Sequence, residues 1–483
     1  MATENMLAVL DCVTIGAGPT GLALAAALSG IEPYLTSHVH PDRRVEAVLT
    51  PLRRPDTGSN PRTLLQILGH GSVARKAAWD LQGRSVHPLS LLYDSLMHPL
   101  ADRGGSRGTT LLAFRRTGKR FRHVVVDAND AMGGNWQQMS KDTLSLSPAS
   151  WMRLPEVDLA AAASADLDSA AVVSNGARIA RSKVASYYSR WFARVCPEQA
   201  NQMIRGMRVV SAQRIKGLNG ELMWKVTANS TANPVVQQQW LTRRLALACG
   251  TAAMPRTLNV PGEQSDWSRT PATTGSNLTA ASPLVSYKFG VMEAALPHIS
   301  STTPIVLVVG AGLSASDAVL RGLRLGWRVY HMFRTTAEQS KLQKMFGQEF
   351  YATRHDKDAI SSHQYSEYLL LLALMHGRSK HVLMMHPNWQ YEPMPLAQVQ
   401  QLSRADEENM VMVTWNSSTR PTQQQLMVSQ VAILVGSRPD LSFLEDDVQE
   451  TLIRDPADLY MHNGRESRHP VFIDVDPFTS QVR

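Results

Sequence analysis

A glycine-rich turn near the start of the chain has the residue types and spacing that bind phosphate. Residues 11–30 read DCVTIGAGPTGLALAAALSG, so an apolar run leads into Gly16-x-Gly18-x-x-Gly21, with Pro19 inside the motif, and then into a stretch typical of a helix. Because glycine lacks a Cβ, the backbone can approach a pyrophosphate, and the helix N-terminus offers free N–H donors. The motif predicts a dinucleotide-binding strand, turn and helix.

A second turn of the same kind lies far along the chain. Residues 304–320 read PIVLVVGAGLSASDAVL, in which an apolar run meets Gly310-x-Gly312-x-x-Ala315, with Ser314 at the start of the expected helix. The two motifs are too far apart for one strand–helix–strand unit. The duplication therefore predicts two dinucleotide-binding domains, each with a parallel sheet and an α/β fold.

The customary window for the acidic residue that usually holds a ribose, at the end of the next strand, is TSHVHPDRR (36–44), and it has no strand pattern. The next apolar strand, HVVV (123–126), ends at Asp127, which we interpret as the missing acid after an insertion. Gly134 then permits close backbone approach, and Trp136 offers a flat surface. The alternatives are a plain surface acid for Asp127 and core packing for Trp136.

In the second unit the apolar strand WRVYHMF (327–333) ends at Arg334, where a 2′-phosphate would lie. A guanidinium pairs bidentately with phosphate, so this residue favours NADPH over NADH. Lys341 and Lys344 could assist. The alternative is a solvated arginine at the end of a strand.

Composition narrows the class of protein. The 483 residues give room for two or three domains, and 43% hydrophobic residues are enough for sizeable cores. The net charge of +8 is scattered, without a basic run interleaved with aromatic residues, so we expect no nucleic-acid partner. The apolar run at 368–377 is too short for a transmembrane helix, which needs about 20 residues. The cytosol is the default location, with the nucleus and mitochondria left open.

Other chemistries find little support. Cys12, Cys196 and Cys249 lie far apart, which argues against a disulfide reductase and against a cysteine-bound metal. The sequence contains neither a Gly-x-Ser-x-Gly elbow nor a His-Glu-x-x-His helix, and its histidines are dispersed. We expect no metal site.

The glycine turns, the Gly-Gly-x-Trp stretch and two strands that end in glycine, LALACG and VAILVG, resemble the flavin-dependent monooxygenases with two dinucleotide-binding domains. Four blocks, at 83–99, 308–320, 436–444 and 469–481, resemble more closely the oxidative stress-induced growth inhibitor family. The resemblance implies FAD at the first turn, NADPH at the second, and Gly250 in the turn that links the domains.

The resemblance also implies a division of the chain. We expect an FAD-binding domain at 1–265 with an insertion at about 31–121, a connector at 266–303, an inserted NADPH-binding domain at 304–430, and a return to the FAD domain at 431–483. The family continues past the last block with a strand, a Gly-Asp turn and a helix, so we expect an incomplete C-terminal end and weak FAD binding.

The implied reaction is hydride transfer from NADPH to FAD, followed by oxygenation of a small-molecule substrate that the sequence does not identify. Because the flavin carries this chemistry, we assign no catalytic acid or base. The alternative function is a regulator of cell growth that keeps the flavoprotein shape with little activity, acting through protein partners.

Overall fold

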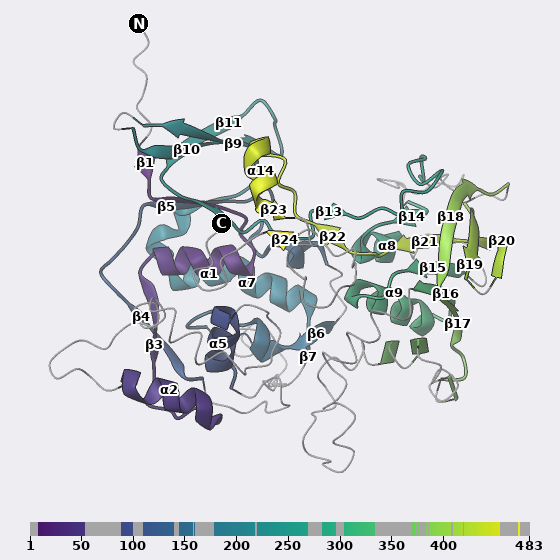
Figure 1. Cartoon of the computed structure of the whole chain (residues 1–483), viewed down its shortest axis with the longest axis horizontal. Helices are drawn as coiled ribbons and strands as arrows, with labels where there is room; N and C mark the ends of the chain where they lie inside the picture. Colours follow the sequence, from purple (N-terminus) through teal and green to yellow (C-terminus); the bar gives the residue numbers. More distant parts are fainter. Residues whose placement is uncertain are drawn as a thin grey trace, which may run out of the picture.

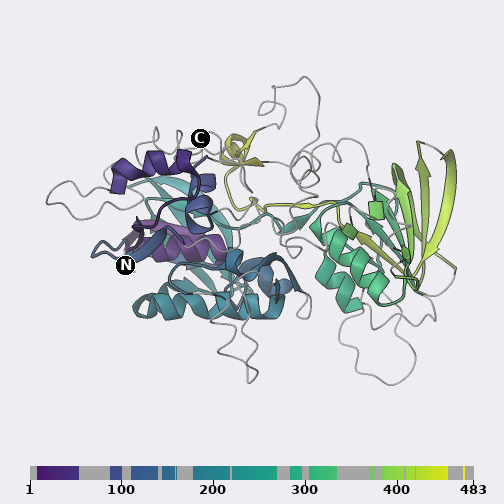
Figure 2. The same cartoon turned by 90° about the horizontal axis from the view of Figure 1, so that it is seen from below.

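The computed structural model describes two lobes, seen on either side of the strands β13 and β22 in Figures 1 and 2. The described residues are 8–53, 88–99, 110–139, 144–157, 159, 178–217, 220–268, 283–295, 304–333, 370–371, 374–375, 383–384, 386–406, 409–418, 420–454 and 472–473. In this part of the chain, no helix combines the length and the apolar character needed to cross a bilayer.

A four-stranded parallel sheet forms the centre of the first lobe. Its order is β12 (Leu245–Leu247), β2 (Cys12–Ile15), β5 (His123–Val126) and β8 (Met203–Ile204). All four residues of β2 are buried, as expected for the middle of a parallel sheet covered on both faces. The predicted second strand is confirmed, because β5 pairs directly with β2.

One face of this sheet is covered by two helices, α1 (Pro19–Leu28) and α7 (Arg181–Val195). Leu22 of α1 and Trp191 and Phe192 of α7 are fully buried in one apolar core. A short 3₁₀ helix, η2 (Gly134–Gln138), packs against α7, which places the Gly-Gly-x-Trp stretch over the same core.

The other face carries a second sheet of order β1 (Val9–Leu10), β11 (Gln237–Thr242), β10 (Leu222–Ser230) and β9 (Met207–Lys216). The last three strands form an antiparallel meander. Ala212 and Val226 of the meander are fully buried against Val13 of β2.

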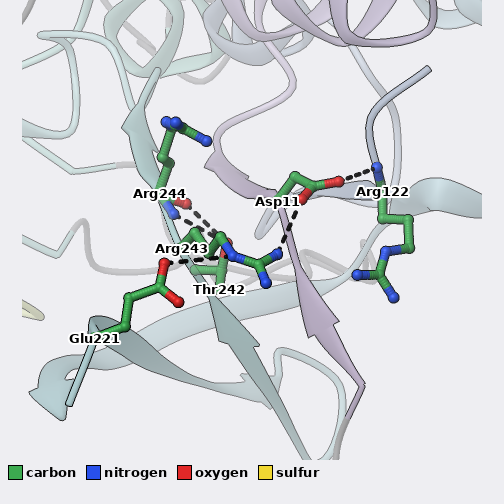
Figure 3. A network of polar contacts seen from close by, with 6 residues as sticks. All are labelled: Asp11, Arg122, Glu221, Thr242, Arg243 and Arg244. Carbon is green, nitrogen blue, oxygen red and sulfur yellow. Dashed lines mark hydrogen bonds and ion pairs between the residues drawn. The ribbon is translucent and has the colours of Figure 1, made fainter. Parts of the chain in front are cut away.

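The chain changes sheets at Asp11, between β1 and β2 (Figure 3). The Asp11 carboxylate accepts the Arg122 backbone N–H at 2.9 Å and a guanidinium N–H of Arg243 at 3.1 Å. Arg243 also lies 3.4 Å from a carboxylate oxygen of Glu221. This network fixes the N-terminal edge of the parallel sheet, on the side away from the glycine turn.

The expected insertion forms its own small layer. A hairpin-like pair, β3 (Ile31–Leu35) and β4 (Leu112–Arg116), is antiparallel and separate from the main sheet. Two helices, α2 (Arg43–Arg53) and α5 (Pro88–Met97), pack on it through Leu49, Leu92 and Leu96. A second antiparallel pair, β6 (Leu144–Pro148) and β7 (Arg178–Ala180), precedes α7, with the 3₁₀ helices η3 (Ala149–Met152) and η4 (Pro197–Gln202) nearby in the chain.

The second lobe holds a five-stranded parallel sheet. Its order is β14 (Val285–Ser286), β21 (Gln430–Ile433), β15 (Ile305–Val309), β16 (Arg328–Phe333) and β17 (Gln390–Pro395). Two helices, α8 (Phe289–Ala295) and α9 (Leu313–Arg324), cover one face through a core that includes Met292 and Val319. The sheet thus takes in β14 from the expected connector and β21 from the start of the expected return, because both strands are buried and the Gln430 side-chain amide donates to the Ser286 hydroxyl at 2.9 Å.

An antiparallel sheet of β18 (Ala397–Arg404), β19 (Val411–Ser417) and β20 (Arg420–Val428) covers the opposite face of the second lobe. The lobes are joined by the antiparallel pair β13 (Met254–Pro255) and β22 (Ser437–Arg438). The chain then continues through α14 (Asp446–Leu452), β23 (Ile453–Arg454) and β24 (Phe472–Ile473), which lie beside the first lobe. Leu441, Phe443 and Leu444 pack into the first lobe's core. The incomplete C-terminal end and the weak FAD binding expected from the sequence stay predictions.

Candidate functional site: two glycine turns and the cavity between them

The first glycine of each motif is required by the backbone. Gly16 has φ +105° and Gly310 has φ +131°, both in the left-handed region. A Cβ on Gly16 would lie 2.3 Å from the Ala248 carbonyl oxygen, and one on Gly310 would lie 2.3 Å from that of Leu434. Each turn is therefore pressed against the end of the neighbouring strand, β12 in one lobe and β21 in the other.

The second glycine of each motif faces open space. A Cβ on Gly18 would meet only the Gly134 Cα, at 4.0 Å, and a Cβ on Gly312 would meet nothing within 4 Å. Each of these residues has φ below zero and N-caps its helix without a side-chain cap. The fold itself does not need these two glycines, and the uncovered N–H groups at both helix starts suit a phosphate.

The remaining motif residues set how each helix leaves its strand. Pro19 occupies the first turn of α1, where a missing N–H costs nothing. A Cβ on Gly21 would lie 1.9 Å from the Gly16 carbonyl oxygen, so only glycine fits. The equivalent Ala315 is fully buried, while Ser314 is exposed and lines a cavity described below.

Asp127 braces the first turn from the end of β5. One carboxylate oxygen accepts the Ala17 N–H at 2.5 Å, and the other accepts the backbone and side-chain N–H groups of Asn129 at 2.7 and 2.8 Å. The side chain is buried. It therefore holds the turn in place before any ligand arrives, and its contact with a ribose remains a prediction.

His331 braces the second turn from inside β16. Its Nε2 lies 2.6 Å from the Gly310 carbonyl oxygen and its Nδ1 lies 2.8 Å from the Tyr391 hydroxyl. The carbonyl can only accept, so Nε2 carries the proton and the tyrosine donates to Nδ1. Burial lowers the pKa of His331 to about 4 and raises that of Tyr391, which keeps both groups neutral.

The position that matches Asp127 in the second lobe is Phe333. Val126 pairs with Ile15 in the first sheet and Met332 pairs with Val309 in the second, so Asp127 and Phe333 each follow the equivalent residue. Phe333 is buried and carries no group that could hold a ribose hydroxyl. The neighbouring Arg334, with Lys341 and Lys344, lies outside the described residues.

The Gly-Gly-x-Trp stretch is anchored to α7. Gly133 and Gly134 both have positive φ, at +121° and +57°, and Gly134 packs directly on Gly18. Trp136 is half-buried against the core, with its ring 6.2 Å from that of Tyr188. The structure thus shows the core packing of Trp136, and its contact with a flavin remains a prediction.

Gly250 lies just after β12 with φ +68° and open space around it. This left-handed turn releases the chain from the first sheet toward β13. Its contact with a cofactor remains a prediction.

A cavity of about 910 Å³ opens at the carboxyl edge of the second sheet. It is lined by the second glycine turn from Gly310 to Ser314, by the ends of β16 and β21, and by Asn135 and Gln138 from η2 of the first lobe. Since η2 begins at Gly134, which contacts Gly18, the cavity extends from the second turn to the segment beside the first. Ligands of open α/β sheets bind at this edge.

An ion pair crosses between the lobes at this cavity. The Arg181 guanidinium, at the start of α7, lies 2.5 Å from the Asp317 carboxylate in α9, and the two side chains are 5% and 9% exposed. The Arg181 guanidinium also lies 5.9 Å from the centre of the Phe289 ring.

The sequence reasoning missed three kinds of residue here. Arg181 and Asp317 lie far apart in the chain, although an acid inside the otherwise apolar helix SASDAVL was a signal. His331 was read as part of a strand, and an imidazole within an apolar run was the signal there. Arg256 and Lys288, two half-buried cations in the cavity wall, carried no local signal.

Comparisons with known proteins identify relatives of this chain. No family model matches the chain. Its curated homologues are oxidative stress-induced growth inhibitors, which confirms the predicted resemblance. Protein 1 of that name from Mus musculus is 28% identical over 490 residues, covering 98% of this chain and 88% of the mouse protein.

A solved structure with a TM-score above 0.5 confirms the fold. The reduced form of the ornithine hydroxylase PvdA from Pseudomonas aeruginosa superposes with a TM-score of 0.51 at 11% identity, over 93% of this chain and 87% of that one. An ornithine N-hydroxylase from Kutzneria sp. 744, in a structure with reduced FAD, NADP⁺ and L-ornithine, has a TM-score of 0.47 at 12% identity, over 93% and 86%. The chain therefore has a two-domain dinucleotide-binding fold like that of this hydroxylase PvdA.

Proposed function

We propose that this chain is a flavoprotein oxidoreductase that binds FAD at the first glycine turn and NADPH at the second, and that oxygenates a small molecule. The observation that carries the proposal is the single cavity that contacts Gly310 to Ser314 directly and reaches η2 beside Gly18. Two dinucleotides seated at these turns would meet at that cavity. Their rings would supply hydride transfer and the reaction with O₂.

The residues present fit both groups. Gly18 and Gly312 leave open cradles that a Cβ would fill, at helix starts whose N–H groups have no side-chain cap. Asp127 would accept a ribose hydroxyl of FAD in addition to its three protein donors. Phe333 replaces that acid in the second lobe, which supports a dinucleotide with a phosphorylated ribose, and Arg334 follows it in sequence.

The other residues orient the ligands and exclude water. Asp127 and His331 hold the two turns in their binding geometry, and Trp136 and Gln137 hold η2 against α7. The Gln137 amide donates to the Met132 and Ala185 carbonyls at 2.6 and 2.9 Å. No acid or base is assigned.

The domain bounds follow from the same proposal. The FAD-binding part comprises residues 1–265 and the segment from about 441, and the NADPH-binding part comprises the sheet between them. Because the relatives carry growth-inhibitor names, we also infer a role in restraining growth under oxidative stress. The alternative is a regulator with the same shape and little activity.

Purified protein tests the proposal through its absorption spectrum. We expect a yellow protein whose bound flavin is bleached by NADPH in the absence of O₂, and Gly18→Val should lose the flavin without unfolding. Gly118→Val is the control, since Gly118 lies in an exposed turn with nothing within 4 Å of its Cβ position. A folded, colourless wild type that takes up no added FAD would favour the regulator.

A further inference from the structure

Two cations in the cavity wall, Arg256 and Lys288, lie outside both glycine turns. Arg256 follows β13 and Lys288 lies between β14 and α8, and both side chains are half-buried. Asp317 is the one acid among the described lining residues, and it already pairs with Arg181. The described wall of the cavity therefore carries two positive charges that are not balanced by an acid within it.

The backbone places both cations at the carboxyl edge of the second sheet. The Arg256 N–H donates to the Gly436 carbonyl at 3.0 Å, and its Cδ lies 3.9 Å from the Cβ position of Gly436, just beyond β21. Lys288 comes two residues after β14, which pairs with β21. Both therefore lie on the β21 side of the second glycine turn.

This position separates them from the 2′-phosphate site. The strand order β14-β21-β15-β16 puts β16, and with it the start of the segment containing Arg334, on the other side of the turn. A ligand phosphate near β16 would lie across the turn from Arg256 and Lys288. These two residues are placed for a negative charge close to the turn itself.

The turn supplies the other half of such a site. Gly312 N-caps α9 without a side-chain cap, the first turn of α9 contains no acid, and the helix is 12 residues long. Its N-terminus carries a partial positive charge, and its first residues, Gly312 to Ser314, line the cavity. The helix start and the two cations therefore line the same cavity.

We propose that Arg256 and Lys288 bind the pyrophosphate of the dinucleotide held at the second glycine turn. This rests on the proposed function, which it extends by assigning the residues that neutralise the charges common to NADPH and NADH. The two cations thus raise the affinity for NADPH and NADH alike. Residues on the β16 side of the turn then discriminate between the two dinucleotides.

Titration calorimetry with NADPH and with NADH on the full chain tests this assignment. Arg256→Gln and Lys288→Gln should each weaken both dinucleotides by about 10-fold, the scale of one charge-assisted hydrogen bond. The loss should be nearly equal for the two, and binding should depend less on salt. Arg208→Gln and Lys216→Gln, two exposed positions of β9, are controls of the same charge change and should bind as wild type.

The outcomes are distinct. Variants that bind both dinucleotides like the wild type, or that lose NADPH alone, overturn the assignment and leave the proposed function standing. A wild type that binds neither dinucleotide overturns the proposed function and this inference together. Circular dichroism checks that each variant is folded. If one glutamine variant misfolds, the variant of the other cation still tests the assignment. Arg256→Lys, which keeps the charge, should recover part of the affinity lost in Arg256→Gln.

Discussion

Arg181 and Asp317 form a buried ion pair that joins α7 of the first lobe to α9 of the second, with 2.5 Å between the guanidinium nitrogen and the carboxylate oxygen. Asp317 lies one turn into the helix that starts at the second glycine motif. The pair therefore ties the helix that follows the second glycine turn to the lobe that holds the first turn.

Removing one partner of this pair should be costly. Arg181→Met leaves the Asp317 carboxylate buried without its guanidinium, and we expect a loss of about 3–5 kcal/mol in the free energy of unfolding. The double variant Arg181→Met/Asp317→Leu should lose less than the sum of the single variants, measured by urea denaturation. Arg214→Gln, which breaks exposed pairs with Glu445 and Asp447, is the control and should cost far less. Additive losses would show that the pair does not couple the lobes.

The two glycines of the second motif should respond differently to alanine. Gly310→Ala forces a Cβ against the Leu434 carbonyl at φ +131°, and the left-handed backbone alone costs about 1–2 kcal/mol of stability. Gly312→Ala has free space and should unfold like the wild type while its methyl group blocks the approach of a phosphate. Thermal melting and dinucleotide titration separate the two effects. Normal binding by Gly312→Ala would remove this turn as the binding site.

Asp127 should matter before FAD binds. Asp127→Ala leaves the buried Ala17 N–H without its acceptor, which costs about 1–3 kcal/mol. We therefore expect a less stable FAD-free protein as well as weaker FAD binding. Asp130→Ala, an exposed acid nearby in the chain, serves as the matched control. If the FAD-free Asp127→Ala protein is as stable as the wild type, the residue acts on the ligand alone.

His331 should make the second lobe sensitive to acid. Burial lowers its pKa from 6.5 to about 4 in the folded chain. Between these values the unfolded chain binds a proton that the folded chain does not, so stability is complete above pH 6.5 and falls as the pH drops toward 4. The loss from this residue should reach about 2 kcal/mol at pH 5.

Urea denaturation at pH 7.5 and pH 5 measures this effect. His331→Gln should remove about 2 kcal/mol of the difference between the two conditions, since the amide can still donate to the Gly310 carbonyl but does not titrate. His38→Gln, at an exposed position, should leave the difference unchanged. An unchanged pH dependence in His331→Gln would show that His331 is not the source of the loss of stability in acid.

The sequence predicted the parts of the fold that depend on neighbours in the chain. The motifs at Gly16 and Gly310 predict a turn, because a strand, a residue with positive φ and a helix follow one another within a few residues. The placement of β5 beside β2 also followed, because the three valines before Asp127 suit no surface segment.

The contacts that the sequence did not predict join distant segments. Arg181 meets Asp317 across the two lobes, and His331 meets Tyr391 across two strands of the second sheet that lie far apart in the chain, so neither pair has a characteristic spacing. The membership of β21 in the second sheet was also hidden, because its apolar residues would suit either sheet. Asp127 was found as an acid at a strand end, but its hydrogen bonds to Ala17 and Asn129 depend on how the turn closes.

The late return of the chain to the first lobe has a consequence for synthesis. Leu441 and Phe443 complete a core begun by Val13, whereas the strands of the second sheet all lie between Val285 and Ile433. During translation the second sheet can therefore form before Leu441 and Phe443 reach the core of the first lobe, roughly ten seconds or more after the meander has been made at ordinary elongation rates. For that interval the first lobe lacks the apolar side chains that complete its core, and chaperones have their best opportunity to bind there.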